Sequence, residues 1–277
     1  MARSTTLLGP WRKFAGNPIL RSGNGWRCPG HADIAADGAG TLTAVFHAYR
    51  AGDGFMAGRQ LLTAPLTFGI DGWPQIGDGR PPPPVPGAAS LAFTDDFTGA
   101  LAPEWEWPLG RVPGRRTGAG GLTLRAPLRE RDGKAVGRRL DGGVLARRLG
   151  TDSYTATAVL DRSSLDGDAA GGLSSYKNAN ELIGLAVNAR RAVVWQRSKG
   201  RGTKLLFGAA TPRGTQVHLR MLARGRRFTF HVSPDGVTWK RVGRPVRSPV
   251  TETARFVLTA GGERRARVRF LSAAVGD

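Results

Sequence analysis

The sequence has little cysteine and no long apolar run, and each shortage excludes a class of protein. Cys28 is the only cysteine among 277 residues, so an internal disulfide or a multi-thiolate metal site cannot form. A free cysteine usually packs as a small apolar residue, so we expect Cys28 to be buried and inert. The sequence lacks the roughly 20-residue apolar run of a membrane span and the apolar segment of a signal peptide. If the chain is complete, we expect it in the cytoplasm, away from membranes.

Acidic residues are also scarce, since 21 Asp and Glu stand against 41 Lys and Arg, for a formal charge of +20. Residues 1–90 hold 8 basic and 5 acidic residues, so residues 91–277 hold the remaining 33 and 16. Such a field attracts polyanions nonspecifically and with strong salt dependence. Only 6 of the basic residues are Lys and the arginines are scattered, which indicates coding bias as much as a binding face. We expect no specific nucleic-acid partner.

Glycine and proline, in contrast, are abundant and favour an all-β fold. The 40 Gly and 18 Pro leave few uninterrupted stretches in which a helix could grow. Four consecutive prolines in residues 81–84 cannot continue a helix or a sheet ladder, because they lack backbone donors. We therefore predict a stiff linker over residues 79–90, between a first domain at 1–78 and a second at 91–277.

The first domain contains two strand candidates joined by a turn-rich loop. Residues 41–49 and 55–62 have strand composition, and the loop over 50–54 suits a hairpin. Together with further Asp-Gly turns they outline about one four-stranded unit. Such a unit cannot bury both faces alone, and in propellers it is covered by neighbouring blades.

The second domain has short strands at the spacing of a two-sheet sandwich. In its clearest hairpin, Phe228, Phe230 and Val232 alternate on one face before an Asp-Gly turn, so that face should be core. The predicted strands are Leu122–Arg125, Val144–Arg148, Tyr154–Asp161, Leu182–Val187, Ala192–Gln196, Lys204–Gly208, Val217–Leu222, Phe228–Val232, Val237–Val242, Arg255–Leu258 and Ala266–Phe270.

Five short motifs follow one another in residues 16–74. They are Gly16-Asn-Pro-Ile-Leu20, Pro29-Gly-His-Ala32, Phe46-His-Ala-Tyr49, Gly58-Arg-Gln60 and Asp71-Gly-Trp-Pro74. In this order they resemble the last blade of glycoside hydrolase family 43, whose five-bladed propellers include β-xylosidases, arabinofuranosidases and arabinanases. The resemblance implies that the first domain is the final blade of a partial five-bladed β-propeller.

The start of the second domain carries another resemblance. Phe93-Thr-Asp-Asp-Phe-Thr-Gly99 and Leu101-Ala-Pro-Glu-Trp-Glu-Trp107 resemble the opening of the concanavalin-like sandwich appended to many β-xylosidases of this family. The hairpin over 233–239 is similar to that domain too. The resemblance implies an all-β chain in which the blade precedes a concanavalin A-like two-sheet β-sandwich.

The family resemblance implies hydrolysis of O-glycosidic bonds in xylosides or arabinofuranosides, with inversion. Inverting enzymes need an acid and a base carboxylate roughly 6.5–9.5 Å apart, and the family delivers these from its first three blades. These 277 residues contain none of those blades, so we assign no catalytic residue and expect the chain alone to be inactive. A separate N-terminal propeller portion would then be its partner.

Two other functions stay open at this point. The sandwich could be a noncatalytic carbohydrate-binding or interaction module, which an exposed tryptophan pair would favour. The basic second domain could instead bind polyanions, with a loss of binding at moderate salt. The residues do not distinguish xyloside from arabinoside.

The resemblance also implies two substrate-binding residues. His31 matches a family histidine near the propeller axis, beside the sugar pocket or a calcium ion, and Arg59 matches an arginine that points into the substrate pocket, where its planar fork can hold hydroxyls. The plainer alternatives are a hydrogen-bonded turn histidine and a solvated strand arginine. His47 alternates with Phe46 in an apolar strand, so we expect a packed core histidine.

The remaining candidates lie in the second domain. Asp95 and Asp96 offer oxygen ligands for a structural calcium ion, while no cofactor is required. Glu104 and Glu106 would share one face of a strand about 6.6 Å apart, but their intervening tryptophans favour a structural segment. The tryptophans at 105, 107, 195 and 239 are expected to be core, the alternative being a sugar-stacking platform.

Overall fold

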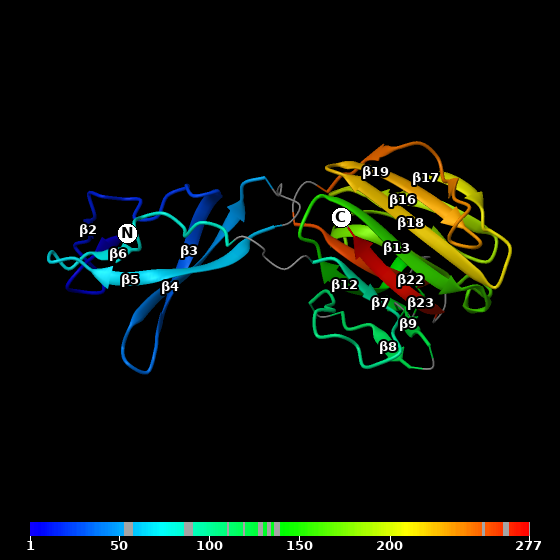
Figure 1. Ribbon diagram of the computed structural model, residues 1–277, viewed down its shortest axis with the longest axis horizontal. Coiled ribbons are helices and arrows are strands. Elements are labelled where there is room, and N and C mark those ends of the chain that lie inside the picture. Colours follow the sequence, from blue (N-terminus) through cyan, green and yellow to red (C-terminus); the bar gives the residue numbers. More distant parts are fainter. Residues whose placement is uncertain are drawn as a thin grey trace. The chain divides into compact units, whose positions relative to one another are not determined.

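The computed structural model describes residues 1–52, 58–85, 91–109, 111–118, 120–126, 130–131, 134–135, 139–250, 253–262 and 266–276. Regular structure in these ranges consists of strands and one 3-10 turn, η2 (Arg162–Ser164), as predicted for an all-β chain. The chain forms two compact units, Met1–Ala89 and Ser90–Asp277, whose strands are labelled in Figure 1. None of the described segments is a helix that could cross a membrane.

The first unit is built around a four-stranded antiparallel sheet with the order β3-β4-β5-β6. Its strands are β3 (Trp26–Ala36), β4 (Leu42–Arg50), β5 (Gln60–Phe68) and β6 (Pro74–Ile76), and a short pair, β1 (Ala2–Arg3) with β2 (Arg12–Lys13), precedes them. β4 lies where the first strand was predicted. The second strand begins later than predicted, at Gln60, and residues 53–57 lie outside the described residues.

One face of this sheet holds the core of the unit. Along β4, Ala44, Phe46 and Ala48 are buried and their neighbours half-buried, so the strand alternates between its two faces. Phe46 is 1% exposed and packs in a cluster with Ala64, Leu66 and Ile76. The prolines after the sheet also contact this unit, because the carbonyl oxygen of Pro82 accepts a hydrogen bond from Trp26 Nε1 at 2.8 Å.

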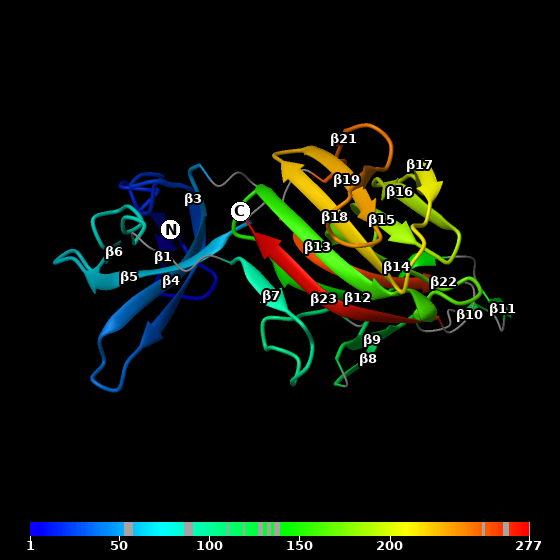
Figure 2. The same ribbon diagram turned by 45° about the vertical axis from the view of Figure 1, so that its right-hand side comes forward.

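The second unit contains two large antiparallel sheets (Figure 2). The six-stranded sheet has the order β12-β22-β14-β15-β16-β17, and the nine-stranded sheet runs β20-β19-β18-β13-β23-β9-β8, with β21 on β19 and β7 on β23. The strands are β7 (Phe93–Asp95), β8 (Gly114–Thr117), β9 (Leu122–Arg125), β10 (Glu130–Arg131), β11 (Lys134–Ala135), β12 (Arg139–Arg148), β13 (Ser153–Asp161), β14 (Ala170–Asn178), β15 (Glu181–Val187), β16 (Arg191–Arg197), β17 (Thr203–Ala210), β18 (Gln216–Arg224), β19 (Arg227–Ser233), β20 (Lys240–Arg241), β21 (Val246–Arg247), β22 (Arg255–Gly262) and β23 (Arg267–Gly276).

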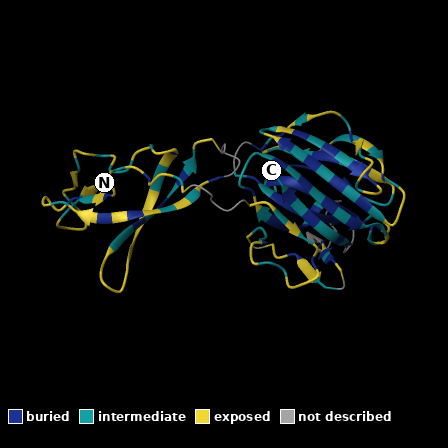
Figure 3. Ribbon diagram, viewed as in Figure 1, coloured by how far each residue is buried: buried dark blue, intermediate teal, exposed yellow. Residues whose placement is uncertain are grey.

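The two sheets pack face to face with the main core between them. Buried and half-buried residues alternate along the strands of the nine-stranded sheet (Figure 3). Phe228, Phe230 and Val232 of β19 are at most 1% exposed, which confirms the predicted core face of that hairpin. The six-stranded sheet differs, because nearly every residue of β14, β15 and β22 is buried on both faces.

β14, one of the two central strands of the six-stranded sheet, was not predicted from the sequence. Its Ala-Gly-Gly-Leu-Ser-Ser composition is typical of a turn, yet packing requires the glycines. A Cβ at Gly171 would lie 2.4 Å from Leu160 and Val268 of the facing sheet, and a Cβ at Gly172 would lie 2.2 Å from the carbonyl oxygen of Leu185. Small residues therefore allow close approach between layers and between strands.

A second strand prediction, over residues 237–242, was mostly wrong. Only Lys240–Arg241 pair as β20. The segment before it is held as a turn by Asp235, whose carboxylate accepts hydrogen bonds from the backbone N–H groups of Val237 at 2.8 Å and Thr238 at 2.7 Å. Side-chain bonds of this kind compete with strand pairing.

The face of the six-stranded sheet that points away from the other sheet, called the outer face below, carries its own apolar cluster. Gly171 points toward the nine-stranded sheet, so Tyr176, five residues along the same strand, lies on the outer face. The cluster contains Val144, Ala146, Tyr176, Leu182, Ala186, Trp195 and Val257, all buried. Segments outside the sheet must therefore cover this face.

Candidate functional site

His31 lies on an irregular part of β3. The pairing of β3 with β4 shifts register on both sides of Gly30, and His31 has a φ of 53°, in the left-handed region that non-glycine residues rarely adopt. The bulged backbone brings the imidazole of His31 beside that of His47 on β4, with the rings stacked at a centroid distance of 5.9 Å.

His47 is not the core histidine that was predicted. Phe46 and His47 point to opposite faces of β4, and Phe46 takes the buried one. His47 is half-buried on the other face, together with Tyr49 two residues later. An apolar neighbour in sequence is a neighbour on the opposite face of a strand, which is why the prediction failed.

Arg59, directly before β5, completes this cluster. Its Nε donates a hydrogen bond to the Tyr49 hydroxyl at 3.2 Å, and its guanidinium carbon lies 5.6 Å from the centre of the Tyr49 ring. The pKa of His47 is lowered by partial burial and then by the electrostatic effect of Arg59 and of the neighbouring His31. The fold therefore brings both predicted substrate-binding residues around His47.

Cys28 lies on the same bulged segment and is exposed, so the prediction of a buried thiol was wrong. Its φ is 51°, and its backbone N–H donates to the Ser22 hydroxyl at 3.1 Å. The irregular backbone, rather than the apolar character of the side chain, decides its exposure.

The His31, His47, Tyr49 and Arg59 side chains together form a polar cluster on the sheet face opposite the core. The histidines can donate and accept hydrogen bonds, and the arginine offers a planar set of donors. Such a set suits neutral hydroxyl groups. Tyr49 was missed in the sequence, although its position two residues after His47 on the same strand could have identified it.

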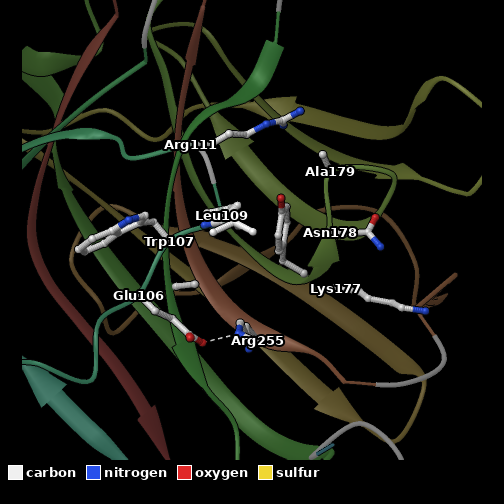
Figure 4. A pocket seen from close by; sticks show the side chains of 11 residues that line it. Glu106, Trp107, Leu109, Arg111, Lys177, Asn178, Ala179 and Arg255 are labelled. Carbon is white, nitrogen blue, oxygen red and sulfur yellow. Dashed lines mark hydrogen bonds and ion pairs between the residues drawn. The ribbon is translucent and has the colours of Figure 1, made fainter. Parts of the chain in front are cut away.

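A pocket of about 310 Å³ lies on the outer face in the second unit. Figure 4 shows Trp107 and Leu109 on one side of it and Lys177, Asn178 and Ala179 on the other. The segment that carries Trp107 is fixed to the sheet by two backbone hydrogen bonds between Glu106 and Ala146 of β12, at 2.9 and 2.7 Å. Lining residues thus come from four separate regions of the sequence.

Glu106 and Arg255 form an ion pair at this pocket, drawn as a dashed line in Figure 4. This arrangement contradicts the prediction that Glu104 and Glu106 share a strand face. Glu104 lies in an exposed turn, 4.0 Å from Arg147, whereas Glu106 alone pairs with the sheet. A proline and a turn before Trp105 prevent a regular strand there.

Asp95 and Asp96 act as hydrogen-bond acceptors. Asp95 accepts from Trp105 Nε1 at 2.7 Å and from the Phe97 N–H at 2.8 Å, while Asp96 accepts from the N–H and hydroxyl of Thr98. In the part of the chain that the structure describes, no three His, Cys, Asp or Glu residues come together as a metal-binding group. His31 therefore belongs to no such group. A calcium ion at Asp95 and Asp96 stays a prediction from the sequence alone.

The four tryptophans of the second unit divide into two kinds. Trp105 and Trp195 are 3% and 0% exposed and belong to the core, as expected. Trp107 and Trp239 are half-buried, each with an arginine about 4 Å from its ring, Arg115 at 4.1 Å and Arg220 at 4.2 Å. Of these, Trp107 lines the pocket.

Comparison with protein families identifies both units. Residues 1–74 match the family described as Glycosyl hydrolases family 43. Residues 94–261 match the family described as Beta xylosidase C-terminal Concanavalin A-like domain. Among curated proteins, no sequence matches this chain.

Similar solved structures extend over the whole chain. The GH43 BlXynB protein from Bacillus licheniformis is 21% identical with a TM-score of 0.71, and 99% of this chain covers 59% of it. The xylan β-1,4-xylosidase from Bacillus halodurans C-125 is 18% identical with a TM-score of 0.70, and 100% of this chain covers 59% of it. The Bacteroides ovatus protein Xyloglucan PUL GH43B is 20% identical with a TM-score of 0.67, and 99% of this chain covers 60% of it. This chain thus shares their fold and spans about three fifths of their length.

Proposed function

Because the chain belongs to glycosyl hydrolases family 43, with the β-xylosidase C-terminal concanavalin A-like domain over residues 94–261, we propose that it is the C-terminal portion of a glycoside hydrolase acting on xylosides or arabinofuranosides. The observation that carries this proposal is the cluster around His47. His31 lies on β3 and Arg59 directly before β5, yet His31 stacks on the His47 ring at 5.9 Å and Arg59 donates to Tyr49, two residues along the same strand face.

In this proposal the cluster binds sugar hydroxyls. Arg59 donates from its planar fork, whose orientation the Tyr49 hydroxyl supports. The lowered pKa of His47 keeps its imidazole neutral at pH 7, so one ring nitrogen accepts and the other donates. His31, stacked on it, adds a second imidazole at the rim. These residues bind and orient a sugar, and none of them replaces a general acid or base.

Hydrolysis with inversion requires two carboxylates about 6.5–9.5 Å apart with a water molecule between them. We assign neither role to a carboxylate of these 277 residues, because Glu106 is engaged with Arg255 and Glu104 lies in an exposed turn. The polypeptide by itself is therefore proposed to be inactive, and a propeller portion that carries the acid and base completes the site.

The blade offers a surface on which such a portion can dock. Leu61 is 75% exposed on the face that carries His47, with which it pairs, whereas Ile34 and Phe68 are 55% and 57% exposed on the opposite face. Large apolar residues exposed on sheet faces are usually covered by another protein surface. In a propeller the neighbouring blade provides this cover.

Two measurements on the purified chain test the proposal. Release of nitrophenol from aryl xyloside and aryl arabinofuranoside is expected to be at background level. Xylobiose should still shift NMR signals of the His31 and His47 side chains, and Arg59→Ala should abolish these shifts while Arg21→Ala, an exposed arginine of the same unit, leaves them intact. Hydrolysis that disappears in Arg59→Ala would disprove the inactivity but keep the sugar site. Shifts unchanged in Arg59→Ala would disprove the site.

A further inference from the structure

The pocket at Glu106 and Trp107 has the composition of a second sugar site. It lies wholly within the second unit, so it is independent of the cluster on the blade and of the proposed hydrolysis. We propose that this pocket binds one acidic sugar unit, a pyranose that bears a carboxylate, within a polysaccharide chain.

The apolar wall of the pocket suits the C–H face of a pyranose. Trp107, Leu109 and Tyr176 line it, and the Arg115 guanidinium 4.1 Å from the Trp107 ring supports that ring. Leu109 is fully exposed, so a ligand that covers it removes apolar surface from water. A volume of about 310 Å³ is at the lower end of the range for small-molecule pockets.

The polar groups of the pocket suit hydroxyls. One carboxylate oxygen of Glu106 accepts from Arg255 Nε, and among the described residues its other oxygen takes no hydrogen bond. Both residues are about one third exposed, at 39% and 32%. Asn178 uses its Oδ1 to accept from the Asn180 N–H at 2.8 Å, which leaves its amide NH₂ available as a donor. The lining therefore offers an acceptor at Glu106 and a donor at Asn178, both of which sugar hydroxyls can use.

The charges at the rim suit a carboxylate. Arg111, Lys177 and Arg255 line the pocket against one acid, Glu106. Arg255 pairs with Glu106, and Lys177 lies 3.3 Å from Glu181. Arg111 forms no ion pair with any described carboxylate, and Figure 4 places it across the pocket from the Glu106–Arg255 pair. A carboxylate at Arg111 and hydroxyls at Glu106 can thus belong to one ligand.

An inorganic anion fits the same pocket poorly. Glu106 would repel a phosphate, and the Trp107 and Leu109 surfaces would stay uncovered. The acceptor oxygen and the apolar wall become useful only when the anion is attached to a ring with hydroxyl and C–H groups. This combination selects an acidic sugar over a free anion.

Isothermal titration calorimetry on the 277-residue chain tests the proposal, at 0.15 M salt to screen nonspecific attraction. Xylotriose carrying one glucuronic acid substituent should bind at least about fivefold more tightly than neutral xylotriose, a difference of about 1 kcal/mol. Arg111→Ala should remove this preference. Arg213→Ala, an exposed arginine far along the sequence from the pocket, should preserve it.

Two further variants locate the ligand. Trp107→Ala should weaken both sugars, with thermal unfolding used to check that the variant folds. Asn178→Asp keeps the oxygen that accepts from Asn180 but removes the donor and adds a negative charge, so it should weaken the acidic sugar more than the neutral one. Equal binding of the two sugars, equal losses in Arg111→Ala and Arg213→Ala, or displacement of the sugar by millimolar phosphate would each overturn the proposal.

Discussion

Arg197 of β16 holds Asp141 of β12 through two hydrogen bonds, at 3.0 and 3.2 Å, although three strands separate β12 from β16 in the sheet. The reach is possible because β12 bulges between Arg139 and Gly143. The bulged segment leaves the ladder and brings Asp141 over the outer face. The side chains of Arg197 and Asp141 are only 12% and 1% exposed. This ion pair therefore covers part of the outer-face cluster that contains Trp195.

Breaking this pair should strongly destabilise the second unit. Arg197→Met removes the Arg197 cation from the buried Asp141 carboxylate, which we expect to cost about 3–5 kcal/mol of unfolding free energy, measured by urea denaturation. Arg201→Met, at an exposed arginine in the adjacent turn, should change it by less than about 0.5 kcal/mol. The double variant Arg197→Met with Asp141→Leu should be more stable than Arg197→Met. A single-variant loss below about 1 kcal/mol would contradict this role.

Gly172 should tolerate no side chain. A Cβ there would lie 2.2 Å from the Leu185 carbonyl oxygen. Because β14 and β15 are both central in the sheet, this clash can be relieved only if the two strands separate. Gly172→Ala is expected to cost at least about 3 kcal/mol or to prevent folding, as judged by circular dichroism and yield of soluble protein. Gly202→Ala, where a Cβ meets nothing within 4 Å, is the matched control. Near-native stability of Gly172→Ala would refute the packing argument.

Asp95 should stabilise the second unit as a hydrogen-bond acceptor for Trp105. That tryptophan is 3% exposed, and its ring packs 5.4 Å from Phe93 and 5.8 Å from Phe97. Asp95→Ala leaves the buried indole N–H unsatisfied and should cost about 1–3 kcal/mol. Millimolar calcium should leave the melting temperature of the wild type unchanged. A calcium-dependent rise that Asp95→Ala abolishes would instead establish a metal ligand.

Stability should fall as the pH decreases through the histidine range. Burial, followed by the charges of Arg220 and Arg241, lowers the pKa of His231, and burial likewise lowers the pKa of His218. The unfolded chain, with a pKa near 6.5, then binds protons more readily than the folded one, so unfolding free energy is lost below about pH 6.5. His231→Gln should flatten the decrease measured by denaturation between pH 7.5 and 5. An unchanged slope would contradict this assignment.

Local patterns in the sequence were sufficient for much of the fold. Period-2 alternation at Phe228, Phe230 and Val232 identified a core face because neighbouring residues of a strand point to opposite sides. The ordered motifs of residues 16–74 and the segment from Phe93 identified the two kinds of sheet unit, and the family matches confirm that resemblance.

The role of the glycines in packing could not be predicted from the local sequence. Gly171 and Gly172 have the composition of a turn, and only the facing Leu160, Val268 and Leu185 show why glycine belongs in a central strand. The same limit applies to the blade, where a bulge in β3 exposes Cys28 and places His31 against His47.

The sequence by itself determined the all-β class, the kinds of unit, the alternation along strands and the excess of positive charge. Tertiary structure alone decided which faces are covered, how Asp141 reaches Arg197, and that residues as distant as Glu106, Tyr176 and Arg255 line one pocket. The physical reason is that alternation follows from the geometry of a single strand, whereas burial and site formation depend on which other segments pack against it.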